Sequence, residues 1–370
     1  MKFSIEKFKI AELISQADSV IEQKTISIIF SNLLLEAFDN NKVFISATDS
    51  NTYFKASDNA KVIQPGKILV NAKKLFDIIK VVPEVELNFE TIDNKSLNIY
   101  SEDRSFEFEL KTMDPSEFTI SFDIIFENRF ELDIDLFKNM IQKTIFSTSE
   151  EMDKQFSTIG VLIEKKEDKI NMIATDKRRL AIYKSFDELP DFLSIVPKKL
   201  LQLILRVRTS ENKCQISITE KKFCFQIGNI QYMSNLLEPK FPNYRTLVQE
   251  NFEYEAIIDT DLFSQNIKMV SAMFSTNDDT IILKLSKNQM SISTLEHELG
   301  KSKVNFEIDY QNENIEISLA YKNIIDFIRV TETKKFKLQL NNPQKALFFL
   351  PVEEKEGLFK YLYITVPVKL

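Results

Sequence analysis

The chain has 370 residues, of which 44% are hydrophobic and 28% are charged. This is ordinary globular composition, so a disordered, collagen-like or coiled-coil chain is excluded. Roughly 100–200 residues per domain would allow two to four domains. The formal net charge is −7, and this total by itself does not indicate a nucleic-acid partner.

No apolar run approaches the ~18 residues of a membrane span. Lys7, Lys9 and Glu12 interrupt the N-terminus too early for a secretion signal. We therefore expect a cytoplasmic protein with no membrane partner.

Three scarcities argue against catalysis. The single histidine, His297, leaves one candidate base for a catalytic triad and excludes a multi-histidine metal site. Two cysteines, Cys214 and Cys224, cannot build an all-cysteine zinc site, and we expect them to be thiols on two strands of a hairpin. Five scattered glycines provide neither a GxGxxG turn nor a phosphate loop. We expect no catalytic residue, no metal site and no cofactor.

The elements alternate in chain order between helical and strand patterns. Apolar residues at helical spacing predict helices over 7–20, 71–82, 136–149, 197–208, 262–274 and 320–331. Asp135 and Asp261 are expected to be N-caps. Alternating runs at 42–46, 96–100, 105–110, 169–173 and 289–293 predict half-buried strands. The fold class is α+β, with mainly antiparallel sheets.

The chain repeats with a period near 125 residues. The helical segments at 71–80, 197–206 and 321–329 align on Lys73, Lys198 and Lys322. Ala-Thr-Asp recurs at 47–49 and 174–176, and Asp-Leu-Phe recurs at 135–137 and 261–263. These echoes predict three domains of one plan, each with two helices, over residues 1–122, 123–250 and 251–370.

Charge is sorted between the helices and the rest of the chain. The six helix windows hold fourteen basic and four acidic residues, whereas the remainder is strongly acidic. One interpretation is that these are ordinary solvated helix faces. The other is a shared basic surface on an acidic body, which suits contact with a polyanion.

Five motifs in order resemble one family. They are Met-Lys-Phe-Ser-Ile (1–5), Ser-Asn-Leu-Leu-Leu (31–35), Thr-Asp-Lys-Arg-Arg-Leu-Ala (175–181), Lys-Phe-Pro-Asn-Tyr-Arg (240–245) and Thr-Val-Pro-Val-Lys-Leu (365–370). Together with the three repeats and the total length, they resemble the bacterial DNA polymerase III beta subunit, the sliding clamp.

The resemblance implies a non-enzymatic processivity factor. It implies three clamp domains forming a crescent, and a homodimeric ring that encircles double-stranded DNA without sequence preference. Expected partners are the replicative DNA polymerase, the clamp loader, and repair factors with short clamp-binding peptides. The resemblance implies DNA contacts at Lys24, Lys154, Phe156, Lys198 and Lys199. Simple solubility is the alternative role for each lysine.

A peptide pocket between the second and third domains is also implied by the resemblance. Its residues would be Thr175, Lys177, Arg178, Arg179, Leu180, Pro242, Thr246, Leu247, Asn323, Pro343, Lys345, Ile364, Val366, Pro367, Val368, Lys369 and Leu370. Leucine, valine and proline side chains would form an apolar socket, and nearby cations would hold an acidic group. Without the resemblance, Leu180, Leu247 and Val366 would be assigned to the core.

The sequence departs from the family pattern at the rim of this pocket. Lys177 and Arg178 follow the Thr-Asp pair, where the family usually has a small residue and then His or Arg. Asn323 replaces a frequent Tyr, Thr246 replaces a common Arg, and Ile28 replaces a common Pro. These changes bear on peptide preference rather than on the fold.

The resemblance also places the seam of the ring. Lys73, Lys74, Phe106 and Phe108 would meet Met273, Phe274, Glu296 and Glu298 of a second copy. Exposed apolar residues on an edge strand need cover, and opposite charges would set the register. The alternative is that the two phenylalanines face their own core.

Two other functions stay open. A hydrolase with paired carboxylates is possible in a chain with 55 acidic residues, although no pair stands out. A clamp-fold adaptor scaffold that does not encircle DNA is the second alternative.

Overall fold

A computed structural model gives the fold of the chain. It describes residues 1–21, 28–93, 95–118, 129–166, 169–186, 191–274, 279–296, 298, 300–352 and 359–369. Within these residues the chain forms two compact units. Unit 1 consists of Met1–Phe137 and Lys199–Leu236, and unit 2 consists of Lys138–Lys198 and Leu237–Leu370.

The helices fall where the apolar periodicity predicts them. The described residues contain α1 (Lys7–Val20), α2 (Ala72–Val81), α3 (Ile134–Thr144), α4 (Lys198–Arg206), α5 (Thr260–Ser271) and α6 (Tyr321–Val330). Short 3-10 turns lie at η1 (Ile28–Ser31), η2 (Pro115–Glu117), η3 (Ile145–Ser147) and η4 (Tyr244–Leu247).

The predicted N-caps were wrong by two residues. The cap of α5 is Asp259, whose Oδ1 accepts from the Leu262 backbone N–H at 2.8 Å. Asp133 Oδ1 accepts from the Leu136 N–H at the same distance. A capping oxygen bonds the amide three residues further on, so both helices begin immediately after these residues. Asp135 and Asp261 lie in the first turns instead.

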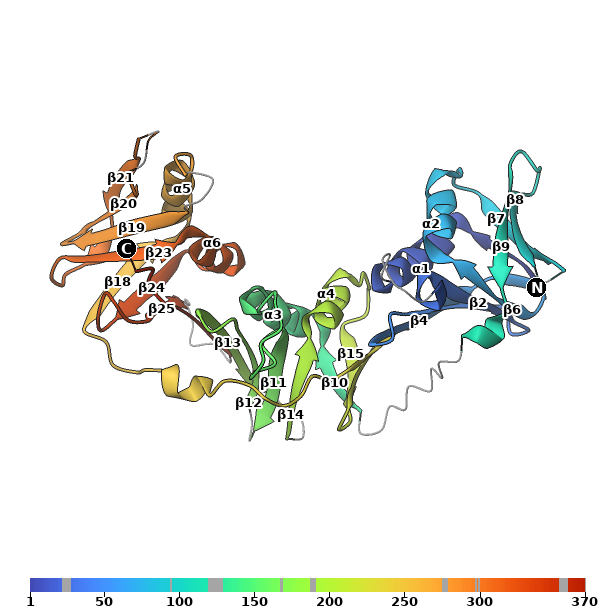
Figure 1. Cartoon of the computed structure of the whole chain (residues 1–370), viewed down its shortest axis with the longest axis horizontal. Helices are drawn as coiled ribbons and strands as arrows, with labels where there is room; N and C mark the ends of the chain where they lie inside the picture. Colours follow the sequence, from blue (N-terminus) through green and yellow to red (C-terminus); the bar gives the residue numbers. More distant parts are fainter. Residues whose placement is uncertain are drawn as a thin grey trace. The chain divides into compact units, whose positions relative to one another are not determined.

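Unit 1 is built on a continuous antiparallel sheet. Its order is β10-β15-β16-β17-β4-β3-β2-β6-β9-β8-β7-β1-β5. The strands are β1 (Lys2–Glu6), β2 (Asn32–Phe38), β3 (Lys42–Thr48), β4 (Thr52–Asn59), β5 (Lys61–Gln64), β6 (Gly66–Asn71), β7 (Glu86–Ile92), β8 (Ser96–Ser101), β9 (Glu107–Met113), β10 (Phe130–Asp133), β15 (Lys213–Ile218), β16 (Lys222–Ile227) and β17 (Ile230–Asn235). Helices α1 and α2 lie side by side against one face of this sheet (Figure 1).

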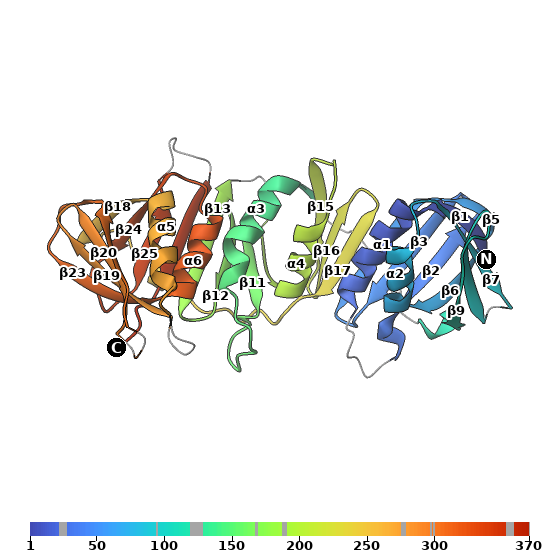
Figure 2. The same ribbon diagram turned by 90° about the horizontal axis from the view of Figure 1, so that it is seen from above.

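Unit 2 contains two antiparallel sheets. Their orders are β14-β11-β12-β13-β26-β25-β24-β18-β22 and β21-β20-β19-β23. The strands are β11 (Gly160–Lys166), β12 (Lys169–Thr175), β13 (Arg179–Phe186), β14 (Phe192–Pro197), β18 (Tyr254–Asp259), β19 (Thr280–Ser286), β20 (Gln289–Thr294), β21 (Lys303–Glu307), β22 (Asp309–Tyr310), β23 (Ile315–Ala320), β24 (Lys335–Leu340), β25 (Leu347–Pro351) and β26 (Phe359–Thr365). Helices α5 and α6 lie side by side on them (Figure 2).

Sheets run from one predicted repeat into the next. In unit 1, β17 pairs with β4 in the register Tyr232↔Phe54. In unit 2, β13 pairs with β26 in the register Leu180↔Ile364. Backbone hydrogen bonds across a sheet must be satisfied when buried, so each join is part of a core and not a loose linker.

The two cysteines lie on neighbouring strands, as predicted. Cys214 is on β15 and Cys224 on β16, both are buried, and no disulfide joins them. The Cys214 thiol donates to the Leu132 carbonyl at 3.4 Å. Burial raises the pKa of the Cys224 thiol to about 11, so it stays protonated and unreactive at neutral pH.

Candidate functional site

The Thr-Asp motif of the second repeat forms a tight turn between β12 and β13. Asp176 Oδ1 accepts from the backbone N–H groups of Arg178 and Arg179, both at 2.9 Å. The Thr175 hydroxyl donates to the Arg179 carbonyl at 2.6 Å and accepts from the Lys177 N–H at 3.0 Å. Lys177 has a φ of 73°. The side-chain oxygens of Thr175 and Asp176 therefore hold the turn in which Lys177 has a left-handed backbone conformation.

The Thr-Asp motif of the first repeat forms the same turn between β3 and β4. Asp49 Oδ1 accepts from the N–H groups of Asn51 at 2.9 Å and Thr52 at 2.6 Å. The Thr48 hydroxyl donates to the Thr52 carbonyl, and Ser50 has a φ of 80°. The Thr-Asp motif that recurs in the sequence therefore forms the same hairpin turn in both repeats.

In the second turn, the other carboxylate oxygen of Asp176 holds Arg179. Arg179 Nε donates to Asp176 Oδ2 at 2.9 Å, Nη1 donates to Asp326 Oδ2 on α6 at 2.6 Å, and Nη2 donates to the Phe146 carbonyl at 2.7 Å. The Arg179 side chain is only 7% exposed. Burial acts to lower its pKa, but the hydrogen bonds and charges of Asp326, Tyr363 and Asp176 together outweigh burial, and the pKa is raised. Arg179 therefore joins structural elements, and its guanidinium is already engaged.

In the first turn, the other carboxylate oxygen of Asp49 holds a lysine. Lys199, in the first turn of α4, forms an ion pair with Asp49 and donates to the Val20 carbonyl at 2.8 Å. The Asp49 side chain is 6% exposed and that of Lys199 is 35% exposed. The neighbouring Lys198 pairs with Glu150 at 2.7 Å, and this contact holds the pKa of Glu150 below its usual value. Both predicted DNA-contacting lysines of α4 thus have carboxylate partners.

The loop that carries Lys154 and Phe156 is organised by Asp153. Asp153 Oδ1 accepts from the N–H groups of Gln155 and Phe156, both at 2.9 Å. Lys177 forms an ion pair with Asp153, and its Nζ lies 5.4 Å from the Phe156 ring centre. This pairing lowers the pKa of Asp153. Lys154 is exposed, whereas Lys24 lies outside the described residues.

The Lys-Phe-Pro-Asn-Tyr-Arg motif fixes the connection after β17 to the sheet. Tyr244 and Arg245 both bond Glu164 on β11: the Tyr244 hydroxyl donates to Oε1, and Arg245 Nη2 lies 2.7 Å from Oε1 and 2.8 Å from Oε2. The Glu164 side chain is 5% exposed. Burial and this hydrogen bond raise the pKa of Tyr244. Sequence analysis missed Glu164, which gives no clear signal because it directly follows the apolar run Gly-Val-Leu-Ile and is followed by two lysines.

An apolar cluster lies beneath the predicted peptide pocket. Leu180 on β13 and Ile364 on β26 are buried in one cluster with Tyr244 and Phe348. Leu247 and Val366, in contrast, are 50% and 41% exposed. The structure thus divides the predicted apolar set into buried floor residues and exposed side chains.

The polar members of the predicted pocket are arranged around the C-terminal segment. The Val366 N–H donates to the Arg178 carbonyl at 3.0 Å, and the Val368 N–H donates to the Ser318 carbonyl at 2.8 Å. Asn323 Nδ2 donates to Thr365 Oγ1 at 3.0 Å. Further predicted members are exposed or half-buried: Pro242, Thr246, Pro343, Lys345, Pro367 and Lys369. Leu370 lies outside the described residues. Thr175 is buried and bonded within its turn.

Of the residues predicted for the ring seam, Lys73 and Lys74 lie on α2 and Phe108 lies on β9, while the others lie in the segments that flank β9, α5 and β20. Strand β9 pairs with β8 over Glu107–Lys111 but with β6 only at Thr112 and Met113. Phe106 and Phe108 are half-buried, with ring centres 6.0 Å apart. In the described residues, β21 pairs only with β20. The remaining seam residues are distributed as follows: Lys73, Lys74, Glu296 and Glu298 are exposed, and Met273 and Phe274 are half-buried.

Some seam residues already have partners within the chain. Glu296 pairs with Lys301 at 3.0 Å, and Phe274 packs edge-on against Tyr321 at 5.0 Å.

His297 lies outside the described residues. Among the residues that the structure describes, no group of three His, Cys, Asp or Glu side chains could hold a metal ion. None of the described helices is both long and apolar enough to cross a bilayer.

Comparison with known proteins agrees with the fold and the repeats. Residues 1–121, 131–243 and 245–364 match the N-terminal, central and C-terminal domains of the DNA polymerase III beta subunit. The beta sliding clamp of Treponema pallidum is 28% identical, with 94% of this chain and 95% of that protein covered. The Bacillus subtilis beta sliding clamp is 25% identical over 93% of this chain and 94% of that protein.

Solved structures show the same fold. The Bacillus subtilis DNA polymerase sliding clamp superposes with a TM-score of 0.92 at 22% identity, covering 100% of this chain and 99% of that one. The beta subunit from Pseudomonas aeruginosa gives 0.90 at 20% identity, with both chains fully covered. The chain belongs to the DNA polymerase III beta subunit family. This confirms the prediction of a processivity clamp rather than an enzyme.

The two lysines of α4 are expected to differ in their effect on stability. Lys199→Met leaves the buried Asp49 carboxylate without its cation, and we expect the free energy of unfolding to fall by about 1–3 kcal/mol. Lys198→Met is the matched control, because its partner Glu150 is 76% exposed and the expected loss is under about 1 kcal/mol. Urea unfolding of both variants measures the difference. Equal losses would contradict a structural role for the Asp49–Lys199 pair.

Proposed function

We propose that two copies of this chain close head to tail into a ring around duplex DNA in the cytoplasm, where the ring tethers the replicative polymerase. The observation that carries this proposal is the tandem match of three clamp domains over residues 1–121, 131–243 and 245–364. We also propose that each copy consists of three clamp domains, residues 1–122, 123–250 and 251–370. A clamp must slide, so phosphate contacts without base readout are suited to it.

Among the proposed DNA-contacting lysines that the structure describes, Lys154 has the least neutralised charge. It is exposed on its loop, whereas Lys198 and Lys199 each pair with a carboxylate. Phe156 beside Lys177 would present part of a ring next to the same strand of DNA. Lys24 completes the proposed set. Each contact is weak and exchangeable, and retention would come from enclosure.

Retention on nicked circular DNA tests enclosure. After loading, we expect the protein to stay on nicked circles and to be lost when the circles are linearised. Lys154→Glu with Lys198→Glu should weaken retention, most strongly at low salt, because exposed charges are screened by added ions. Lys213→Glu with Lys284→Glu is the charge-matched control, because both lysines are exposed, pair with a glutamate and lie outside the proposed DNA-contact set. Equal retention on circular and linear DNA would instead support the clamp-fold adaptor scaffold.

We infer that the peptide pocket is formed by the exposed side chains above the buried cluster. Leu247 and Val366 supply apolar surface, while Lys177, Arg178 and Lys345 supply positive charge at the rim. Burying one Leu or Phe anchor of a partner would contribute about 1.5–3 kcal/mol. Clamp loader, polymerase and repair factors would share this site through short peptides.

Peptide affinity tests this placement. Val366→Ala combined with deletion of Leu370 should weaken binding of a clamp-binding peptide at least about tenfold, as measured by fluorescence anisotropy. Leu193→Ala is a control, since Leu193 is 55% exposed on β14 and outside the proposed pocket. Undiminished affinity in the pocket variant would refute the placement.

We propose that the seam joins the open edge of β9 in one copy to β21 of the other. Phe106 and Phe108 would then be covered, and Lys73 and Lys74 would face Glu296 and Glu298. Phe106→Glu with Phe108→Glu should convert the dimer to a monomer, because two carboxylates cannot be buried there without partners. Light scattering at micromolar concentration measures the state. A wild-type monomer, or a variant that stays dimeric, would count against the seam.

A further inference from the structure

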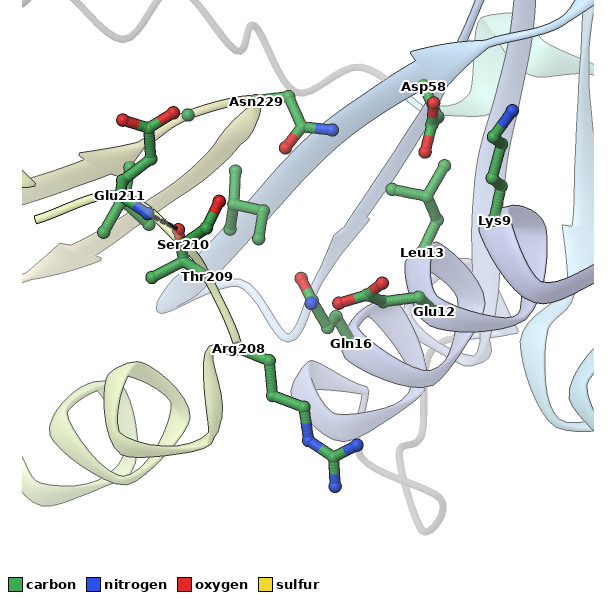
Figure 3. A pocket seen from close by; sticks show the side chains of 13 residues that line it. Lys9, Glu12, Leu13, Gln16, Asp58, Arg208, Thr209, Ser210, Glu211 and Asn229 are labelled. Carbon is green, nitrogen blue, oxygen red and sulfur yellow. Dashed lines mark hydrogen bonds between the residues drawn. The ribbon is translucent and has the colours of Figure 1, made fainter.

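A groove in unit 1 runs between α1 and the segment that follows α4. Two adjoining pockets of about 330 Å³ and 750 Å³ share Glu12, Gln16, Arg208, Thr209 and Ser210, so they form one continuous channel. Glu12 and Gln16 project from α1, and Arg208–Glu211 form the facing wall (Figure 3). None of these residues belongs to the proposed DNA, peptide or seam sets.

At the equivalent place in unit 2, the two facing positions form an ion pair. The Thr-Asp turns of the first and second repeats are 127 residues apart, and the α4 and α6 lysines are 124 apart. These offsets equate Gln16 with Lys143 and Arg208 with Glu332. In unit 2, Lys143 Nζ lies 3.2 Å from Glu332 Oε2, and the Lys143 side chain is only 10% exposed.

In unit 1, the same two positions do not pair. Gln16 Oε1 is shielded from solvent and accepts no hydrogen bond in the described part of the chain. Arg206 and Arg208 are exposed, and neither forms an ion pair with any described carboxylate. A buried acceptor without a donor costs free energy. The groove therefore has one unmet acceptor and two unneutralised guanidinium groups.

An exposed aromatic ring completes the groove. Phe8 is 57% exposed and lines the larger pocket together with Arg206 and Tyr232. It lies on the same face of α1 as Glu12, Ser15 and Ser19, four, seven and eleven residues further along. A ring left in water at the mouth of a polar groove offers a stacking platform.

We propose that this groove binds a single-stranded segment of nucleic acid. Arg206 and Arg208 hold phosphates, a base stacks on Phe8, and the exposed Glu12 carboxylate accepts from the amino group of a base. The acidic residues Asp58 and Glu211 line the smaller pocket and disfavour phosphate there, so the phosphates stay at the end of the groove that Arg206 lines. A duplex keeps its bases stacked inside, so it cannot offer a base face to Phe8. The site needs neither a ring nor a duplex, and it goes beyond the proposed clamp function.

Oligonucleotide binding tests the groove directly. The probe is a fluorescein-labelled oligodeoxycytidine of about twelve nucleotides, within the usual range of single-strand sites. Measured by anisotropy on the full chain, Phe8→Ala and Arg208→Glu should each weaken binding at least about tenfold. Lys95→Glu makes the same charge change on an exposed lysine at the β7–β8 turn, away from the groove, and should change binding less than about twofold.

A double substitution is designed to close the groove with a new ion pair, so that loss of binding cannot be attributed to loss of folding. Gln16→Lys with Arg208→Glu installs in unit 1 the pair that unit 2 already has. We expect the double variant to be at least as resistant to urea as the parent and to lose oligonucleotide binding at least about tenfold. The same variant should keep its retention on nicked circular DNA.

The outcomes separate this proposal from the clamp function. Loss of oligonucleotide binding with unchanged retention on circles supports the groove. Unchanged oligonucleotide binding in the double variant would overturn it, even if retention on circles is normal. Parallel loss of both readouts would also overturn it, because the groove would then be part of the duplex-binding surface. A failed clamp function would instead appear as no retention by the parent protein.

Discussion

The structure depends on one recurring contact: an aspartate in a hairpin turn that binds a cation, which is a lysine of a neighbouring helix in the first repeat and an arginine of the same hairpin in the second. In the first repeat, Asp49 fixes its own turn through two backbone amides and binds Lys199 at the start of α4. In the second, Asp176 does the same locally and binds Arg179, which reaches Asp326 on α6. Each aspartate thus defines a strand connection and also helps to hold the following repeat. A neutral side chain at either position could not do both.

The aspartate is the same in both contacts, but the two cations differ in burial and in their number of acceptors. Arg179 is 7% exposed, and each of its three guanidinium nitrogens donates to a different acceptor. Lys199 is 35% exposed and has two acceptors around a point charge. The groove beside α1 is a second difference between repeats. Gln16 and Arg208 occupy the positions that in unit 2 hold the Lys143–Glu332 ion pair. Divergence of repeated positions, rather than a new fold element, accounts for the difference.

Much of the fold could be predicted because it follows from periodicity. Apolar spacing located the helices, and the recurrence of Thr-Asp indicated the repeat, although not the turn that both copies form. The N-caps were misplaced because Asp135 and Asp261 are as suitable chemically as Asp133 and Asp259, and only geometry distinguishes them. Glu164 was missed because its partners, Tyr244 and Arg245, lie about eighty residues away in the chain. Charge counts likewise predicted basic helices but not which lysines are paired.

The continuity of the sheets across repeats has a consequence for how this chain can be divided. Strand β4 finds a neighbour in β17, and β13 finds one in β26, each from a later part of the sequence. A fragment cut at the end of the first repeat would leave a row of amide and carbonyl groups of β4 without partners, and such borders recruit other chains. The boundaries of the sequence repeats and the boundaries of the hydrogen-bonded units therefore differ in this protein. Fragments for expression would have to follow the hydrogen-bonded units rather than the sequence repeats.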